Sequence, residues 1–357
     1  MSVDTAIRST ELVCTVDALK VFAREVFERA GMTGTDAGVM ADCLARAHLR
    51  GFDTHGLGCI PLYVENLLDG RVNARPDIRI EQRSGWALRV DADNGMGHVA
   101  ATRTMEAVIR SVRSIGIGIG SVRNTNHLGA ACLYPLMAVE QGFIGLAMVN
   151  SSVHVTPWGS RDKLFGTNPI AIAAPAGKQP PFVLDMATSA AARRKFRLAL
   201  ELDQPIPEGW AVDANGVPTT DPATALKGAA LPVGGAKGSG LGMAVEILAG
   251  VLSGAAFAGD VLDLFSNQER HVNSGNFLMA MDVSAFMDRA EFEARMDTLI
   301  ERMKSLQAAP DFDEVRFPGE RGARLEAERL QNGIPLPEST VRALSDVGSR
   351  LGVTFPG

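Results

Sequence analysis

The sequence predicts an α/β fold, and two features of the chain support this class. Apolar residues at helical spacing occupy residues 16–30 and several later segments. Three short apolar runs have the length and composition of buried strands: 143–149, 169–174 and 182–184. Turn-rich polar segments lie beside these runs, and Asp185 ends one of them. Because open α/β sheets carry their sites at strand ends, we expect residues 121–188 to organise the site.

Length and composition are those of an ordinary globular protein. The 357 residues suggest two or three lobes, and 46% hydrophobic with 21% charged residues allows a sizeable core. The formal net charge is −6, and the chain contains no dense run of Lys and Arg. Because binding to a phosphate backbone requires concentrated positive charge, we expect no nucleic-acid partner.

The cysteines and the apolar segments bear on location. Four cysteines lie far apart, without CxxC pairs or the histidine spacing of zinc sites, so we expect a reducing compartment and no metal. Residues 1–22 lack the basic region and apolar core of a secretory signal. The apolar run 239–258 approaches membrane length, but Glu246 and four glycines within it favour a buried helix. These features predict a soluble, cytoplasmic protein with no membrane partner.

The N-terminal part is predicted to be mainly helical. Helices are expected at 15–30, ended by Gly31, and at 36–48. The second helix leads into a loop at 50–58, whose glycines allow sharp turns and present the polar side chains between them. Alternating apolar residues at 76–93 predict two strands about a turn.

Helices and strands alternate through the rest of the chain. A glycine-rich strand at 115–119 follows a helix at 99–113. A dinucleotide fingerprint needs a strand before its glycines and a helix after them, so this GIGIG segment is not one. Further helices are expected at 128–141, where Pro135 kinks or restarts the chain, and at 189–202, 241–252 and 339–351, in a mostly helical tail from 286. The Pro/Gly/Asp-rich stretch 202–231 is expected to be a long loop.

Two of the six histidines are candidate catalytic bases. His55 and His127 lie in turns rich in Gly or Asn rather than on a helix face. Histidine suits the removal of a hydroxyl proton near neutral pH. No pair of histidines has the i, i+4 spacing with a carboxylate that would indicate a metal.

A glycine-rich segment with one lysine is a candidate anion site. Residues 234–240 surround Lys237 with glycines and open an apolar helix, where free N–H groups bind phosphate or carboxylate. The alternative is a glycine-rich turn that lets the helix pack closely. Asp185 has two compatible interpretations as well: it orients a histidine or binds ribose hydroxyls, or it caps the following helix.

Ordered motifs over nearly the whole chain resemble one family. They are RGFDTHG (50–56), DNGMGH (93–98), RNTNHLGAA (123–131), PWGSRDKLFGTNPIAIAAP (157–175), LDMATS (184–189), IPEGWAVDANGVPTTDP (206–222), GGAKGSGLGMAVEILAG (234–250), GNFLMAMD (275–282) and FPGER (317–321). This pattern is similar to the malate/L-lactate dehydrogenases of the second type, which are unrelated to the Rossmann-type lactate and malate dehydrogenases. The family also contains ureidoglycolate, sulfolactate and diketogulonate oxidoreductases and piperideine-2-carboxylate reductases.

The resemblance implies a homodimeric α/β enzyme with a non-Rossmann nicotinamide domain. It also implies hydride transfer between NAD or NADP and a small 2-oxo/2-hydroxy acid or a cyclic 2-imino acid. The organisation expected for this chain has three parts. They are a helical N-terminal scaffold lobe at 1–120, a cofactor-binding domain at 121–285, and a C-terminal helical segment at 286–357 that packs on the N-terminal lobe.

The resemblance also implies roles for particular residues. Thr54 and His55 match a Ser-His pair of the family, and His127 matches a histidine described as proton acceptor in the ureidoglycolate branch. We expect His127, then His55, to be the catalytic base, with Thr54 and Asp185 orienting it. Cofactor or substrate contacts are implied for Leu128, Gly129, Ala130, Ala131, Asn168, Pro169, Asp185, Met186, Ala187, Lys237, Gly238, Gly275, Asn276 and Phe277.

Two departures from the family pattern concern the substrate. Many members have an arginine where this chain has Cys59, and an aromatic residue where it has Ser239. Other hypotheses therefore stay open: a hydrolase in which Thr54, His55 and Asp185 form a triad, and a catalytically silent relative that binds small acids. The basic run 193–195 either neutralises the 2′-phosphate of NADP or is surface, so NAD and NADP also stay open.

Overall fold

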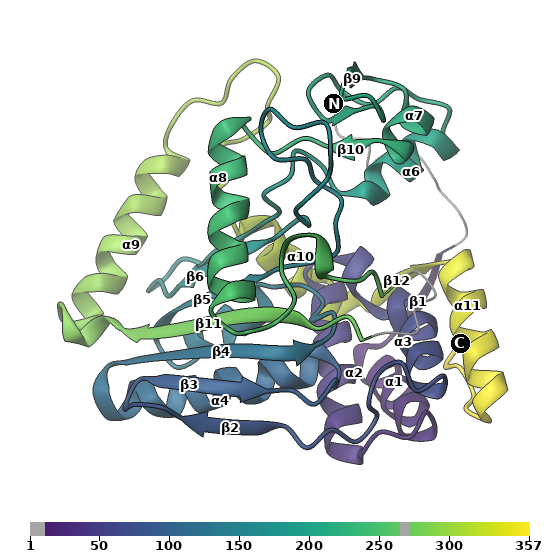
Figure 1. Ribbon diagram of the computed structural model, residues 1–357. Coiled ribbons are helices and arrows are strands. Elements are labelled where there is room, and N and C mark those ends of the chain that lie inside the picture. The colour runs from purple at the N-terminus through teal and green to yellow at the C-terminus, as the bar shows by residue number, and fades with distance from the viewer. Residues whose placement is uncertain (1–10, 265–270) are drawn as a thin grey trace. The chain divides into compact units, whose positions relative to one another are not determined.

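The computed structural model describes residues 11–264 and 271–357 (Figure 1). Residues 1–10 lie outside the described residues. They are the first part of the segment 1–22, which was expected not to be a secretory signal. The chain forms two compact units, one from residues 1–75 and 319–357 and the other from 76–318. From the sequence we expected three lobes, at 1–120, 121–285 and 286–357. This division stays a prediction.

The first unit contains five helices among its described residues. They are α1 (Val16–Arg29), α2 (Gly34–Leu49), α3 (Ile60–Leu68), α10 (Glu320–Asn332) and α11 (Glu338–Leu351). Strands β1 (Glu11–Cys14) and β12 (Ile334–Pro337) pair antiparallel beside them. The Thr15 and Thr33 hydroxyls accept hydrogen bonds from the first turns of α1 and α2, which fixes where both helices begin. The two helices predicted in this region and the last helix of the chain are confirmed.

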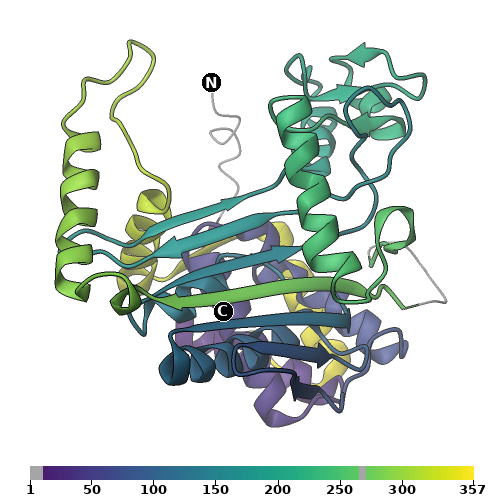
Figure 2. The same cartoon turned by 60° about the vertical axis from the view of Figure 1, so that its left-hand side comes forward.

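The second unit is built on a seven-stranded sheet. Its strands are β2 (Arg79–Gln82), β3 (Ala87–Asp91), β4 (Ile117–Thr125), β5 (Phe143–Val149), β6 (Ile170–Ala174), β7 (Phe182–Met186) and β11 (Ser274–Asp282). They lie in the order β2-β3-β4-β11-β5-β6-β7. Only β3 and β4 run parallel, and every other neighbouring pair is antiparallel. Figure 2 shows β11 crossing the middle of the sheet, between strands that precede it by more than a hundred residues.

Helices α4 (Gly97–Ile115) and α5 (Leu133–Val139) cover one face of the sheet. A Cβ at Gly120 would stand 2.3 Å from Cγ2 of Thr104, and one at Gly118 would stand 2.5 Å from the Val108 carbonyl oxygen. The glycines of the GIGIG segment are therefore required by the close packing of α4 on β4. This geometry agrees with the rejection of a dinucleotide fingerprint there.

On the opposite face, α8 (Ala236–Val245) continues as a π-helix, η4 (Glu246–Val251). Val245 and Ala249 of this helix pack with Ile170 on the sheet. Helix α9 (Arg289–Lys304) also belongs to this unit, as do the short 3₁₀ turns η5 (Ala258–Asp260) and η6 (Val283–Ala285).

Two sequence expectations for this unit need correction. The helix expected at 128–141 is limited to α5, because Gly129 has a φ of +76° and Pro135 lacks the N–H that only a first helical turn can spare. The expected loop at 202–231 contains helix α7 (Pro222–Lys227). It also contributes a small sheet of β8 (Ala211–Val212), β9 (Pro218–Thr219) and β10 (Ala229–Ala230), next to α6 (Arg193–Glu201).

The predicted α/β class is confirmed, with a seven-stranded sheet and eleven α-helices among the described residues. In that same part of the chain, no helix combines the length and apolarity needed to cross a membrane.

Candidate active site

Four of the predicted cofactor segments leave from one edge of the seven-stranded sheet. Strand register aligns Asn276 with Val149, and Ile170 with both Met148 and Met186. Strands β4, β5 and β7 end along this row, while β11 and β6 begin there. The segments brought to this edge are 127–131, 168–169, 185–187 and 275–277. The second unit therefore collects residues that are spread over 150 positions in the sequence.

The turn that carries His127 is held by residues 94–98. The Asn126 amide is buried and donates to the carbonyl oxygens of Asn94 and Gly95, each at 3.0 Å. A Cβ at Gly97 would stand 2.1 Å from the Asn126 carbonyl oxygen, so only glycine fits there. The half-buried His127 ring packs edge-to-face on buried His98, with centroids 6.2 Å apart. The backbone of the turn is therefore held in place, and the imidazole packs against one neighbouring ring.

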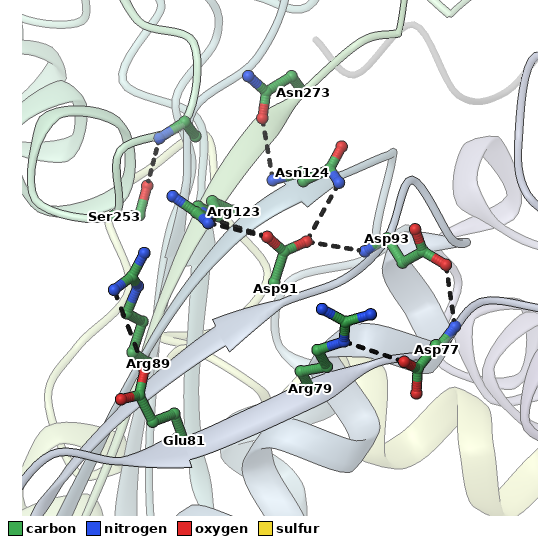
Figure 3. Close-up of polar contacts among 11 residues, drawn as sticks. Asp77, Arg79, Glu81, Arg89, Asp91, Asp93, Arg123, Asn124, Ser253 and Asn273 are labelled. Carbon is green, nitrogen blue, oxygen red and sulfur yellow. Dashed lines mark hydrogen bonds and ion pairs between the residues drawn. The ribbon is translucent and has the colours of Figure 1, made fainter.

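A polar cluster secures the end of β4 just before this turn (Figure 3). The Asp91 carboxylate accepts from Nε of Arg123 and Nδ2 of Asn124, both at 3.1 Å. The Asn124 N–H in turn donates to Oδ1 of Asn273 at 2.9 Å. Burial opposes ionisation of Asp91, but hydrogen bonds from the Asp93 N–H, Asn124 and Arg123 outweigh it and lower its pKa. The cluster joins the end of β3 to the start of β11.

Asp185 lies at the end of β7 and binds the segment that follows His127. Its Oδ2 accepts from the Cys132 N–H at 2.9 Å, at the start of α5. The interpretation of Asp185 as a cap for the helix that follows it is wrong, because α6 begins after Ala192. Burial raises the pKa of Asp185, and the hydrogen bond from Cys132 opposes this rise. The carboxylate therefore links β7 to residues 128–131.

Residues 128–131 form a tight, largely buried segment. Leu128, Ala130 and Ala131 are buried. A Cβ at Gly129 would stand 2.4 Å from Nε2 of His98. Any contact of this segment with a ligand would therefore involve its backbone more than its side chains.

Asn168 is fully buried and its side chain is used within the protein. Its Oδ1 accepts from the Ser151 N–H at 3.1 Å, and its Nδ2 donates to the Gly242 carbonyl and to Glu246 Oε1, at 3.1 and 2.9 Å. Its φ of +39° is tolerated by asparagine. Glu246 also accepts from Asn150 Nδ2 at 3.3 Å and from the Ala258 N–H at 2.9 Å. Glu246 thus ties the π-helix to the strand edge.

Asn276 differs, because neither atom of its fully buried amide has a hydrogen-bond partner among the described residues. Buried polar groups are normally paired, so this amide is available to a group from outside the chain. Neighbouring Gly275 donates its N–H to Asn150 Oδ1 at 2.8 Å, and Phe277 is buried. A nicotinamide nucleotide offers amide, hydroxyl and phosphate groups, and the residues of this edge fit such a cofactor.

Lys237 is exposed in the first turn of α8. Gly238, beside it, is packed so closely that a Cβ would stand 2.0 Å from the Val233 carbonyl oxygen. The packing interpretation of this segment is therefore confirmed for Gly238, whereas the anion site at Lys237 stays a prediction. Lys237 precedes Gly242, which Asn168 contacts, by five residues, or about 7.5 Å along a helix. Ser239 accepts from the Trp158 N–H at 3.0 Å.

In the first unit, Thr54 and His55 lie in the 3₁₀ turn η2 (Asp53–His55), followed by η3 (Leu57–Cys59). Thr54 Oγ1 and His55 Nδ1 are 2.8 Å apart. The Cys59 thiol donates to the Thr54 carbonyl at 3.2 Å. Arg50 is buried in an ion pair with Glu326. Its charge is therefore already engaged within the first unit.

Arg329 of α10 and His48 of α2 hold this turn through Asp53. Arg329 Nη1 lies 2.9 Å from Asp53 Oδ1, and His48 Nε2 lies 3.4 Å from the same oxygen. Burial lowers the pKa of His48, although Asp53 acts in the opposite direction. Sequence analysis did not identify Arg329, because 276 residues separate it from Asp53. Glu246 was also not predicted to belong to the site. Its charge within the apolar run 239–258 could have indicated a buried polar contact.

Among the described residues, no group of three or more histidine, cysteine, aspartate or glutamate side chains could hold a metal ion.

Known proteins match this chain over most of its length. A family model described as malate/L-lactate dehydrogenase matches residues 14–345. The L-sulfolactate dehydrogenase of Methanocaldococcus jannaschii is 37% identical over 331 residues, 93% of this chain and 95% of that protein. A solved structure of sulfolactate dehydrogenase from that organism matches with a TM-score of 0.90 at 36% identity, over 96% of this chain and 98% of its own.

Two further relatives carry other names. The malate dehydrogenase of Pyrococcus horikoshii is 37% identical over 345 residues, 94% of this chain and 95% of that protein. The Δ1-pyrroline-2-carboxylate/Δ1-piperideine-2-carboxylate reductase of Pseudomonas putida is 34% identical over 332 residues, 92% of this chain and 95% of that protein.

The fold and these matches define an oxidoreductase that uses NAD or NADP. The chain belongs to the malate/L-lactate dehydrogenase family, as the sequence predicted.

Proposed function

We propose that the chain interconverts a 2-hydroxy acid and the corresponding 2-oxo acid with NAD or NADP, and that His127 is the proton acceptor. The observation that carries this proposal is the single strand edge at which the His127 turn, Asp185 and unpaired Asn276 emerge. Relatives named malate dehydrogenase and L-sulfolactate dehydrogenase support the same class of substrate.

The proposed mechanism assigns proton transfer to the chain. In the oxidising direction, an imidazole nitrogen of His127 accepts the hydroxyl proton while the carbinol carbon loses hydride. The nicotinamide of a bound cofactor supplies the hydride acceptor. In the reducing direction the same nitrogen returns the proton to the oxygen. The close approach of Gly97 holds the backbone at His127, and the packing of its ring on His98 helps to orient the imidazole for this transfer.

Supporting roles follow from the contacts at each residue. Asp185 fixes residues 128–131 through the Cys132 N–H, so that their backbone can line the cofactor. Asn276 offers its unpaired amide, and Lys237 offers a positive charge beside the N-terminus of α8. The remaining contacts proposed are Asn168, Pro169, Met186, Ala187, Gly238, Gly275 and Phe277. His55 is the second candidate base, with its ring oriented by Thr54.

The cofactor domain is proposed to be of a non-Rossmann type. The mostly antiparallel sheet supports this, because a Rossmann sheet is mostly parallel with helices on both faces. The three lobes expected from the sequence, at 1–120, 121–285 and 286–357, are proposed as functional divisions.

We also propose that the protein is a homodimer. Met243, Ile247 and Val251 are 56%, 48% and 53% exposed and recur every four residues along α8 and η4. The opposite side of the same helix buries Glu246 and Ala249. An exposed apolar stripe of this kind is typical of a protein interface. Ile247→Glu should reduce the mass measured by light scattering to that of one chain, whereas an unchanged mass excludes this interface.

A cytoplasmic location is proposed from the cysteines. The four cysteines all lie within the described residues and form no disulfide, which suits a reducing compartment.

A second candidate function is the reduction of a cyclic 2-imino acid. Cys59 favours it, because this residue is smaller than an arginine and leaves more room for the ring of a cyclic substrate. The Pseudomonas putida relative is named as a reductase of such imines.

One steady-state screen tests both functions. Absorbance at 340 nm should be followed with NADH and NADPH against 2-oxo acids and cyclic 2-imino acids. Turnover of a 2-oxo acid that His127→Ala abolishes supports the main proposal. Turnover of imines alone supports the second. Nicotinamide binding without any turnover would leave the chain as a silent relative that binds small acids, and ester hydrolysis without nicotinamide would favour the triad of Thr54, His55 and Asp185.

A further inference from the structure

A recess in the second unit lies next to the small sheet of β8, β9 and β10. Its polar lining comes from His154, Lys163, Thr167 and Arg193, and Phe196 contributes to its apolar side. The recess is shallow and opens to solvent, so that the space of about 300 Å³ next to its lining includes open solvent. Three of its lining residues belong to elements labelled in the teal region of Figure 1: Phe196 to α6, Ala225 to α7 and Ala230 to β10. The sequence alone predicted no function for His154, Lys163 or Thr167.

The charge in this recess is predominantly positive. Lys163 and Arg193 both act on the half-buried His154: burial lowers the pKa of this imidazole most, and the two cations lower it further. Asp263 faces the same imidazole and acts in the opposite direction. Arg193 donates Nη2 to the Leu226 carbonyl at 3.3 Å, a neutral acceptor. Within the described residues neither Lys163 nor Arg193 forms an ion pair, so both charges are available to an anion.

The recess adjoins the segments proposed to bind the cofactor. Thr167 lines it and immediately precedes Asn168. The Thr167 carbonyl accepts from the Thr188 N–H at 2.8 Å, one residue beyond the 185–187 segment. An anion in the recess would therefore lie beside two parts of the proposed cofactor site. A phosphate group carried by the cofactor fits both the charge and this location.

The basic run at the start of α6 separates into one lining residue and two outward residues. Arg193 lines the recess, whereas Arg194 and Lys195 are exposed. Lys195 Nζ instead lies 5.4 Å from the centroid of the Trp210 ring. Arg194 and Lys195 therefore provide matched controls, because they have the same charge and the same helix but do not line the recess.

We propose that this recess binds a phosphate monoester through Lys163, Arg193 and Thr167, and that its source is the 2′-phosphate of NADP. The inference rests on the proposed function and goes beyond it by favouring NADP over NAD. Free inorganic phosphate has related chemistry and is the competing source.

The test uses nucleotide fragments that carry no nicotinamide, so its readout is independent of turnover. Calorimetry measures the Kd of 2′-phospho-ADP-ribose and of ADP-ribose for the full chain. Wild type should bind the 2′-phosphorylated fragment at least about tenfold more tightly, because a charge-assisted contact of this kind corresponds to that ratio or more. Arg193→Ala and Lys163→Ala should each remove most of this preference and leave the Kd of ADP-ribose unchanged.

Arg194→Ala and Lys195→Ala should keep the preference. Arg193→Gln can still donate to the Leu226 carbonyl, and it should lose the preference for the 2′-phosphorylated fragment as Arg193→Ala does. This variant shows that the loss of preference comes from the lost charge and not from unfolding. Equal Kd values of the two fragments for wild type overturn the inference, although NADH-dependent turnover would leave the proposed function standing. The other opposing outcome has two parts: millimolar inorganic phosphate competes with both fragments, and wild type shows no preference between them. If Arg193→Ala weakens this competition, the recess binds free phosphate and the inference is overturned.

Discussion

Substitution of Glu246 should destabilise the protein more than most single changes. The carboxylate is 4% exposed, and it accepts hydrogen bonds from Asn150, Asn168 and the Ala258 N–H. Two of these bonds measure 2.9 Å and one 3.3 Å. Hydrogen bonds to a charged group contribute about 1.5–3 kcal/mol each, but burying the carboxylate opposes them. Glu246→Ala leaves the neutral Ala258 N–H without an acceptor and removes one acceptor from each asparagine amide, so we expect a loss of about 1–3 kcal/mol.

The assay is urea unfolding at 25 °C, followed by circular dichroism and by tryptophan fluorescence. The control is Glu291→Ala on α9, where an exposed i, i+4 pair with Arg295 should be worth no more than about 0.5 kcal/mol. Glu246→Ala should also raise the Kd of the cofactor, because Asn150 links Glu246 to the Gly275 N–H. A loss below about 1 kcal/mol with an unchanged m-value would refute the reasoning.

Four further outcomes are expected. His127→Ala should lower kcat by about 10²–10⁴-fold with cofactor Kd unchanged, and a near-normal kcat would transfer the role to His55. Lys237→Ala should weaken cofactor or anionic substrate binding by about 1–2 kcal/mol, measured by calorimetry, and unchanged constants leave only the packing role of the glycines. Cys59→Arg should lower KM for pyruvate, and a wild type already efficient on pyruvate argues against the idea. The contribution of Asp185 to the free energy of unfolding should fall as pH rises above 3.8, because its raised pKa makes the folded state bind the extra proton. Asp185→Asn should flatten this dependence, and an equal slope in the variant contradicts it.

Local pattern was sufficient to predict much of the fold. The helix at 16–29 has both a threonine cap and an apolar stripe, and each signal is contained within a few residues. The hairpin of β2 and β3 follows from alternation about a turn. Strand β11 could not be predicted in its place, because its partners β4 and β5 lie more than 120 residues earlier in the chain. Pairing at that separation leaves no local signal.

The sequence was sufficient to predict which segments form the candidate site, but not which hydrogen bonds join them. Polar residues at strand ends indicated where residues 127, 168 and 185 would emerge, and the structure brings these positions to one edge. The sequence could not indicate that Asp185 binds the Cys132 N–H instead of capping its own helix. Nor could it separate Arg193 from its two basic neighbours, because helix geometry decides which of the three lines the recess.

Asn168 and Asn276 show what the structure adds to a resemblance. Both are fully buried, and both were expected among the cofactor contacts for the same reason. Every polar atom of the Asn168 side chain is engaged by Ser151, Gly242 or Glu246, so its side chain can only hold the backbone in position. The Asn276 amide has no partner among the described residues, so its hydrogen-bonding groups are left unsatisfied within that part of the chain. The two asparagines therefore serve different purposes, and only Asn276 is equipped for direct contact through its side chain.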